Sequence, residues 1–205
     1  VAASRSGTTW SASYTLGANS SVTGANRNVS VTATDEAGNA TTQADTSNAT
    51  VDATPPVVSA ANISLSGATG TGGAFKIGDT VTATWNDTSS GDNNGDIASV
   101  SVDFTEFGGG AVAATNSSGT WTATYTVVPG SIDATNRNVT VTATDTADNS
   151  TSQTDTDNVT VDNVAPALTD GAIAVSGQTG NPSNSIFKIG DTVTVSWDNT
   201  AGGDN

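Results

Sequence analysis

The chain has 205 residues, with 20 acidic and 5 basic side chains and a formal net charge of −15 at pH 7. This balance argues against nucleic acids and anionic membrane surfaces as partners, because both need clustered Lys and Arg, and it favours cations. Cys, His and Met are absent, which excludes disulfides, His-based catalysis and the usual zinc and copper ligands.

The distribution of residues along the chain also argues against membrane insertion and against an enzyme. The apolar runs are short, so we expect no membrane insertion. The acidic residues cluster in turns rather than in an apolar pocket, so we expect no enzyme and assign no catalytic residue. The chain has neither a starting Met nor a signal-like segment, so we expect a piece of a longer or processed protein. Abundant Thr and Val with few Lys is typical of a secreted, extracellular β protein.

Apolar and polar residues alternate along seven short stretches in the middle of the chain. Alternation with period 2 between turn residues predicts β-strands, and no useful helical window is present. About seven strands in roughly 110 residues are typical of an Ig-like sandwich. The predicted strands fall, in chain order, at 63–65, 75–77, 81–85, 100–104, 121–127, 139–143 and 159–161.

The sequence repeats itself after about 111 residues, which defines its domain organisation. Three phrases recur: TWSASYTL (9–16) at 120–127, NRNVSVTATDEAGN (26–39) at 136–149, and FKIGDTVTATW (75–85) at 187–197. The boundaries fall at VDATPP and VDNVAP, because Pro lacks an N–H and opens the next unit. We therefore expect the C-terminal part of one repeat over 1–53, a complete repeat over 54–164, and the N-terminal part of the next over 165–205.

An acidic loop, WNDTSSGDNNGD, follows the predicted strand at 81–85. It contains Asp87, Asp92, Asn94 and Asp96. Calcium prefers six to eight oxygen ligands, and a D-x-N-x-D run in a Gly-containing loop brings alternate side-chain oxygens together. The loop differs from an EF-hand, since its Gly is at the fourth position and no Glu is at the twelfth. A calcium-type loop is one interpretation, and a solvated turn is the other.

A second group of acidic residues combines positions that are distant in sequence. The first repeat contributes Asp35, Asn39 and Asp52, and the complete repeat contributes Asp145, Asp148 and Asp162. We expect the ends of the strands at 139–143 and 159–161 to meet at one pole, where the linker leaves. Carboxylates gathered there repel one another unless a cation lies among them. Calcium at the junction is one interpretation, and polar turn residues that keep the strand ends soluble are the other.

The phrases VTVTATDTADN and VTVDNVAP resemble the bacterial Ig-like and cadherin-like repeats of giant surface adhesins. This resemblance implies tandem Greek-key sandwiches that act as stiff, calcium-bound extenders at the cell surface, in contact with adjacent copies of the same repeat. It implies that Asp35, Asp52, Asp145 and Asp162 are junction ligands. A glycan or cell-surface ligand would then bind to domains outside this sequence.

Two further hypotheses remain open. One is a carbohydrate- or protein-binding Ig-like module, which aromatic residues exposed on one face would favour. The other follows from the repeat, since no second copy of the stretch 94–111 is present. We expect either a window of an unbroken array or a filament subunit in which residues 165–205 complete residues 1–53 of the next chain by β-strand complementation.

Overall fold

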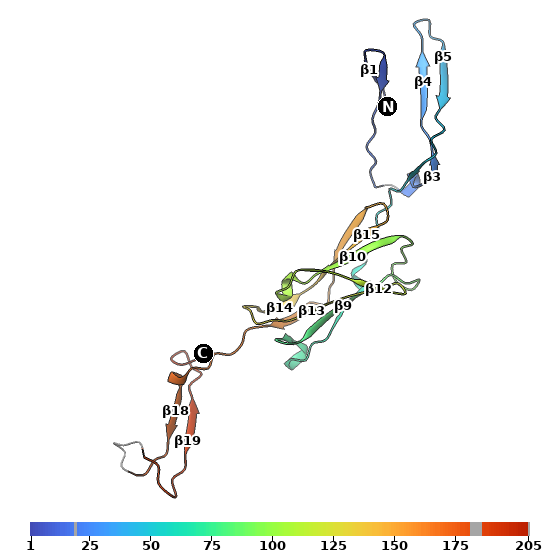
Figure 1. Cartoon of the computed structure of the whole chain (residues 1–205). Helices are drawn as coiled ribbons and strands as arrows, with labels where there is room; N and C mark the ends of the chain where they lie inside the picture. The colour runs from blue at the N-terminus through green and yellow to red at the C-terminus, as the bar shows by residue number, and fades with distance from the viewer. Residues whose placement is uncertain (19, 181–185, 205) are drawn as a thin grey trace. The chain divides into compact units, whose positions relative to one another are not determined.

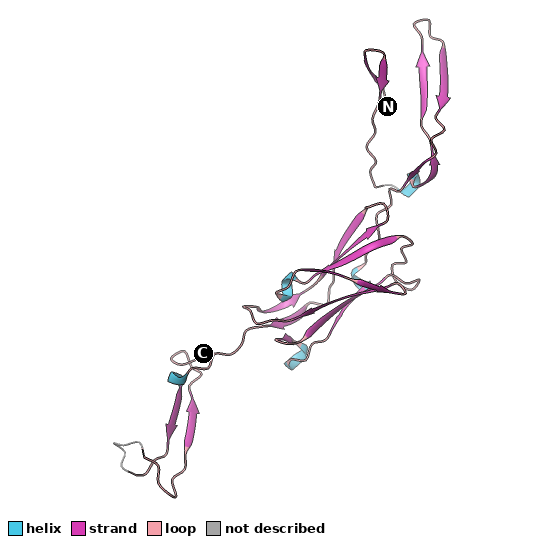
Figure 2. Cartoon of the chain, in the orientation of Figure 1, coloured by secondary structure: helices cyan, strands magenta, loops and turns pink. Residues whose placement is uncertain are grey.

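The computed structural model describes residues 1–18, 20–180 and 186–204 (Figure 1). Internal contacts divide the chain into two units, Val1–Val128 with Ile132–Asn163, and Pro129–Ser131 with Val164–Asn205. The described residues form short strands and 3-10 turns, and none of them is in an α-helix (Figure 2). The prediction of an all-β chain is therefore confirmed. Within the described ranges, no helix is long and apolar enough to cross a membrane.

The first sheet of the larger unit has four antiparallel strands in the order β12-β13-β9-β7. Its central pair sets Trp121 opposite Trp85. The alternation in β9 buries Val81, Ala83 and Trp85, as the period of 2 predicts. The strands are β7 (Ile63–Ser66), β9 (Thr80–Asn86), β12 (Thr115–Ser117) and β13 (Thr120–Thr126).

The second sheet also has four antiparallel strands, in the order β11-β10-β15-β16. An irregularity between Ile97 and Ser99 shifts the register of β10 against β15. The buried residues of β10 and β15 again alternate with more exposed ones, so that one face of this sheet joins the core. The strands are β10 (Ile97–Asp103), β11 (Ala111–Ala113), β15 (Thr140–Asp145) and β16 (Ser150–Thr154).

A third sheet, in the order β14-β17-β8, extends the hairpin formed by β15 and β16. The chain runs through β14 and β15, turns, and returns through β16 and β17, so that β15 pairs with β16 and β14 pairs with β17, the latter with a register shift between Ala134 and Arg137. β8 adds to β17 in parallel, with Phe75 opposite Val161. These strands are β8 (Phe75–Lys76), β14 (Asp133–Arg137) and β17 (Val159–Asp162).

One apolar core lies between these sheets and gives this region its sandwich-like character. Phe107 meets the ring of Phe75 edge-on at 5.6 Å, and Phe104 stacks on Tyr125 at 5.8 Å between ring centroids. Phe107 comes from the 3-10 turn η4 (Thr105–Phe107), outside any alternating stretch, so the strand pattern did not predict it. The buried members are Val58, Ile63, Phe75, Val81, Ala83, Trp85, Val100, Val102, Phe104, Phe107, Ala123, Val127, Val139, Val141, Ala143 and Val161.

The first 53 residues of the larger unit form three separate two-stranded sheets, β1-β2, β3-β6 and β4-β5. Their strand residues are exposed or half-buried, so this segment has no apolar core of its own among the described residues. The strands are β1 (Ser4–Ser6), β2 (Thr9–Ser11), β3 (Gly24–Arg27), β4 (Ser30–Thr34), β5 (Ala40–Ala44) and β6 (Ala49–Val51).

In the described residues of the smaller unit, β18 (Ile173–Ser176) pairs antiparallel with β19 (Thr194–Trp197). The residues of both strands are also exposed. The remaining short elements of the chain are 3-10 turns, namely η1 (Ser20–Val22), η2 (Ala60–Asn62), η3 (Thr71–Gly73) and η5 (Asp170–Ala172).

Candidate metal centre

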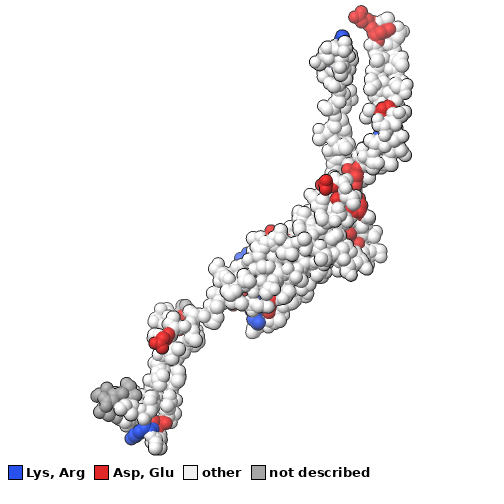
Figure 3. All heavy atoms as spheres, in the orientation of Figure 1, with Lys and Arg blue, Asp and Glu red and all other residues white. Residues whose placement is uncertain are grey.

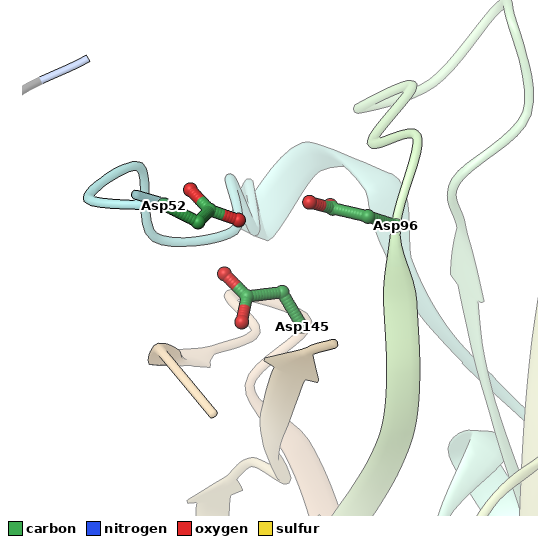
Figure 4. A group of neighbouring side chains, drawn as sticks. All are labelled: Asp52, Asp96 and Asp145. Atoms are coloured by element: carbon green, nitrogen blue, oxygen red, sulfur yellow. The ribbon is translucent and has the colours of Figure 1, made fainter. Parts of the chain in front are cut away.

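Three carboxylates from distant parts of the larger unit gather at one place (Figure 4). Asp52, Asp96 and Asp145 each offer one oxygen, and these oxygens lie within 4.8 Å of one another. Asp52 directly follows β6, Asp96 directly precedes β10, and Asp145 ends β15. Asp52 and Asp145 point toward one another, and Asp96 points toward them from the start of β10 (Figure 4). We call these residues the aspartate triad.

Asp145 is oriented by the hairpin turn that it opens. Its Oδ1 accepts the backbone N–H groups of Ala147 and Asn149, each at 2.9 Å, and its Oδ2 accepts the Asn149 side-chain amide at 2.9 Å. Asp148 takes a positive φ of 66° in this turn, a conformation that Asp and Asn tolerate better than most residues. The fully buried Asp145 carboxylate is thus fixed in position by its own turn.

Asp52 and Asp96 are held against the same turn through their main chains. The Asn149 amide also donates to the Asp52 carbonyl oxygen at 3.4 Å, and the Thr146 N–H donates to the Asp96 carbonyl oxygen at 3.0 Å. The Asp52 Oδ1 accepts the Thr54 N–H at 3.0 Å, so the backbone of the linker fixes the orientation of this side chain. The linker and the complete repeat therefore meet at the turn after β15.

The triad concentrates negative charge without a basic neighbour. Burial of the Asp96 carboxyl group, followed by the negative charges of Asp145 and Asp52, raises the pKa of Asp96 above its ordinary value. Among the described residues, no Lys or Arg side chain lies within 4.0 Å of the three carboxylates. Basic side chains are sparse on the face shown in Figure 3. No basic side chain therefore offsets the repulsion among the three carboxylates. Their oxygens are the hard ligands that calcium prefers.

The acidic loop between β9 and β10 does not bring its carboxylates to one point. Asp92 binds the segment after the linker, because its Oδ2 accepts the Ser59 N–H at 2.8 Å and the Trp85 Nε1–H at 2.7 Å. Its Oδ1 accepts the Asn62 amide at 2.7 Å. Burial raises the pKa of Asp92, but the hydrogen bonds from Ser59, Trp85 and Asn62 outweigh this effect and leave the pKa lowered.

Asp87 and Asn94 form a second tie to the linker. Asp87 Oδ1 accepts both the N–H and the side-chain amide of Asn94, each at 2.7 Å. Asn94 in turn exchanges two hydrogen bonds of 2.8 Å with the backbone of Val57. Only Asp96 of the four residues predicted in this loop joins the triad. Asp92 and Asn94 of this loop thus hold residues 57–62 through hydrogen bonds, and we call this arrangement the linker clamp. Ion binding by Asp87, Asp92 and Asn94 stays a prediction.

The other predicted ligands lie apart from the triad. The expectation that the strand ends near 143 and 161 meet at one pole is wrong. The register pairs Thr144 with Ser150 beside the hairpin turn and Asp162 with Asp133 at the opposite end. The reason is that these strands are the two arms of one long antiparallel hairpin. Asp145 and Asp162 are consequently at opposite ends of it.

Asp35 and Asn39 reproduce the turn of Asp145 and Asn149 in the first partial repeat. The Asp35 Oδ1 accepts the Asn39 N–H at 2.8 Å, and its Oδ2 accepts the Asn39 amide at 2.9 Å. The bond from the Asn39 amide is the main cause that lowers the pKa of Asp35. Asp148 is exposed beside the triad and contributes no oxygen to it. These positions stay predictions as metal ligands.

The sequence predicts all three members of the triad as ligands, but in two different groups, with Asp96 in the acidic loop and Asp52 and Asp145 at the junction. The missing information was the hairpin, which carries Asp145 toward the preceding linker. A sequence signal for this exists, because the turn residues AGN and ADN mark the hairpin tip in both copies. No protein-family model, no curated protein and no solved structure matches this chain.

Proposed function

We propose that this chain is a non-enzymatic structural part of a long extracellular adhesin or surface filament. In this proposal its tandem Ig-like repeats act as an extender that calcium stiffens at the junctions. The observation that carries the proposal is the aspartate triad, in which the linker supplies Asp52 and the complete repeat supplies Asp96 and Asp145. This site forms only when the linker residue Asp52 lies against the turn after β15 of the complete repeat.

The strand order supports the Ig-like assignment. Ig constant-type sandwiches have one sheet with the order A-B-E-D and one with strands C, F and G. The order β7-β9-β13-β12 corresponds to the first sheet, and β10-β15-β16 corresponds to the second. If β14 with β15 and β16 with β17 are each counted as one bent strand, the complete repeat has about the number of strands that an Ig-like domain needs.

The chemistry of the triad supports a hard divalent cation over a purely structural role. The Asp145 carboxylate is fully buried, and holding charged groups this close without a counter-ion is unfavourable. A bound Ca²⁺ reverses the sign of the interaction, because each carboxylate then faces a double positive charge. The three carboxylates offer one oxygen each, and water can supply the other ligands of a shell of six to eight.

Stiffening follows from where the ligands lie in sequence. Asp52 is in the linker, whereas Asp145 is in the hairpin turn of the next repeat, 93 positions later (145 − 52). An ion bound by both removes the rotational freedom that the linker otherwise has. The clamp formed by Asp92 and Asn94 already holds residues 57–62, so that the freedom left for calcium to remove is concentrated near Asp52.

A calcium titration of the whole chain by isothermal calorimetry tests the site. We expect binding that Asp52→Asn and Asp96→Asn each weaken by more than tenfold. Asp148→Asn is the matched control, because it removes the same charge beside the triad from a residue that contributes no oxygen to it, and Asn tolerates the positive φ at this position. Equal effects of the three substitutions would show a diffuse attraction to an acidic surface and would contradict the proposal.

Small-angle scattering tests the mechanical role. With calcium in place of a chelator, we expect a larger maximum dimension and a narrower spread of conformations. Asp52→Asn should remove this difference, while Asp148→Asn should retain it. If the scattering curves with calcium and with chelator coincide for the unmodified chain, an extender stiffened by calcium is ruled out.

A further inference from the structure

The loop between β9 and β10 contains the single Asn-Gly pair of the sequence, Asn94 followed by Gly95. Asn94 is half-buried and Gly95 is exposed, and both lie before the first residue of β10. Deamidation of Asn begins when the backbone nitrogen of the next residue attacks the side-chain amide carbon. Gly has no side chain to hinder this attack, and its backbone is the least restricted of all residues. The reaction therefore meets the least hindrance in this chain at Asn94.

The Asn94 amide is also a central part of the linker clamp. Its Nδ2 donates to the Val57 carbonyl oxygen at 2.8 Å and to Asp87 Oδ1 at 2.7 Å. Its Oδ1 accepts the Val57 N–H at 2.8 Å. This set of bonds needs a side chain that donates on one side and accepts on the other, as an amide does, whereas an ionised carboxylate can only accept. The clamp thus depends on the residue at position 94 remaining an amide.

We propose that Asn94 is a site of spontaneous deamidation, and that this reaction irreversibly opens the part of the linker clamp that Asn94 forms. The Gly95 backbone nitrogen gives its proton to water and forms a bond to Asn94 Cγ. The bond from Cγ to Nδ2 breaks, and Nδ2 takes a proton from water and leaves as ammonia. Water then opens the resulting succinimide at either carbonyl carbon, which gives aspartate or isoaspartate. In total, one amide and one water become one carboxylic acid and one ammonia.

The product cannot re-form the bonds of the amide. The new carboxylate faces the Val57 carbonyl oxygen and the Asp87 carboxylate, and neither of these groups donates a hydrogen bond. Because Asp87 is only 8% exposed, water screens the repulsion between the two carboxylates poorly. Isoaspartate also lengthens the main chain between β9 and β10 by one carbon. Deamidation therefore releases Val57 from the loop.

The closed clamp slows the reaction that would open it. The three hydrogen bonds to Val57 and Asp87 hold the Asn94 side chain, so its Cγ is not free to turn toward the Gly95 nitrogen. The reaction consequently proceeds from chains in which these bonds are transiently broken. The amount of carboxylate formed at position 94 thus records how long this part of the clamp has been open.

The same loop offers two matched variants. Asn93 is exposed and is followed by Asn94, whose side chain hinders the attack, so it is the control for the effect of Gly. It has a positive φ of 55°, which Asp also tolerates, so Asn93→Asp adds one charge without straining the backbone. At Gly95 the φ lies outside the left-handed region and a methyl group would meet no other atom within 4 Å, so Gly95→Ala fits the folded loop.

Incubation of the whole chain in mildly alkaline buffer with chelator tests the chemistry. Peptide mass spectrometry locates each replacement of an amide NH2 by OH. In the folded chain we expect Asn94 to convert at least about fivefold faster than Asn93, and Gly95→Ala to slow conversion at position 94 about tenfold. Urea should accelerate conversion of Asn94, because it opens the clamp. Conversion of Asn94 no faster than that of Asn93, or unaffected by Gly95→Ala or by urea, would overturn the proposal.

Thermal unfolding in chelator tests the consequence for the clamp. Asn94→Asp should lower Tm by roughly 4–8 °C, because it removes the donor to Val57 and Asp87. Asn93→Asp adds the same charge and should lower Tm by less than about 2 °C. Equal melting temperatures of the two variants would also overturn the proposal. Both experiments leave the aspartate triad unchanged and free of calcium, so their outcome is independent of the calcium titration.

Discussion

The complete repeat and the two partial repeats carry nearly the same phrases but differ in burial. Val141 is fully buried, whereas its equivalent Val31 is 68% exposed. Trp85 is fully buried, whereas Trp197 is about half exposed. The polar ties, in contrast, are the same, since Asp35 and Asn39 bond as Asp145 and Asn149 do. Local hydrogen-bonded turns thus form from short stretches of sequence, and the core forms only when both halves of a repeat are present.

The largest expected difference between the regions concerns the two tryptophans. Trp85→Ala should lower the free energy of unfolding of the complete repeat by about 3–5 kcal/mol, because it leaves a cavity in the core. Trp197→Ala should change it by less than about 0.5 kcal/mol. Urea unfolding followed by circular dichroism at low protein concentration measures both effects. A comparable loss from Trp197→Ala would mean that β19 already contributes to the core.

Substitution of Asp92 and of Asp204, which accept hydrogen bonds from these tryptophans, should show a smaller difference in the free energy of unfolding between the two regions. Asp92→Ala removes the acceptor of Trp85 Nε1–H and of the Ser59 N–H, so we expect a loss of about 2–4 kcal/mol in the complete repeat. Asp204→Ala should leave that transition unchanged, since its partners lie in the smaller unit. If Asp92→Ala proves neutral, the loop is not the linker clamp described above.

Much of this difference between the complete repeat and the partial repeats could be predicted from the sequence. The alternating stretches predicted the strands at 81–85 and 121–127, and the repeat predicted which segments are alike. The sequence could not assign the three aspartates of the triad to one site, because Asp52 and Asp145 are 93 residues apart and meet only through the hairpin of β15 and β16. The pattern also did not predict the role of Asp92, since an Asp in a Gly-rich loop looks the same whether it binds water, an ion or a buried Trp Nε1–H.

A smaller effect is expected from loss of the hydrogen bond that the Thr69 hydroxyl donates to the Asp79 carboxylate. The Thr69 side chain is the main cause that lowers the pKa of Asp79 from 3.8 to about 2. The stabilisation is therefore fully present above pH 3.8 and is lost as the pH falls through about 2. Thr69→Val should cost about 1.5–3 kcal/mol at pH 7 and progressively less below pH 4. Urea midpoints of both chains between pH 2 and 7 measure this, and a difference that is independent of pH would contradict the assignment.

The most direct measurement of the central claim is the thermal unfolding of the native chain and of Asp96→Asn, each with calcium and with chelator. Because burial, followed by the negative charges of Asp145 and Asp52, raises the pKa of Asp96, its charge destabilises the fold as the pH rises, so in chelator the substitution should raise Tm by roughly 2–4 °C. At a calcium concentration of 100 Kd, the native chain should gain about 2.7 kcal/mol, or roughly 10 °C, and Asp96→Asn should gain far less. The order of the two melting temperatures should thus reverse between the two conditions. If calcium raises both equally, or neither, the triad is not a calcium site that joins the repeats.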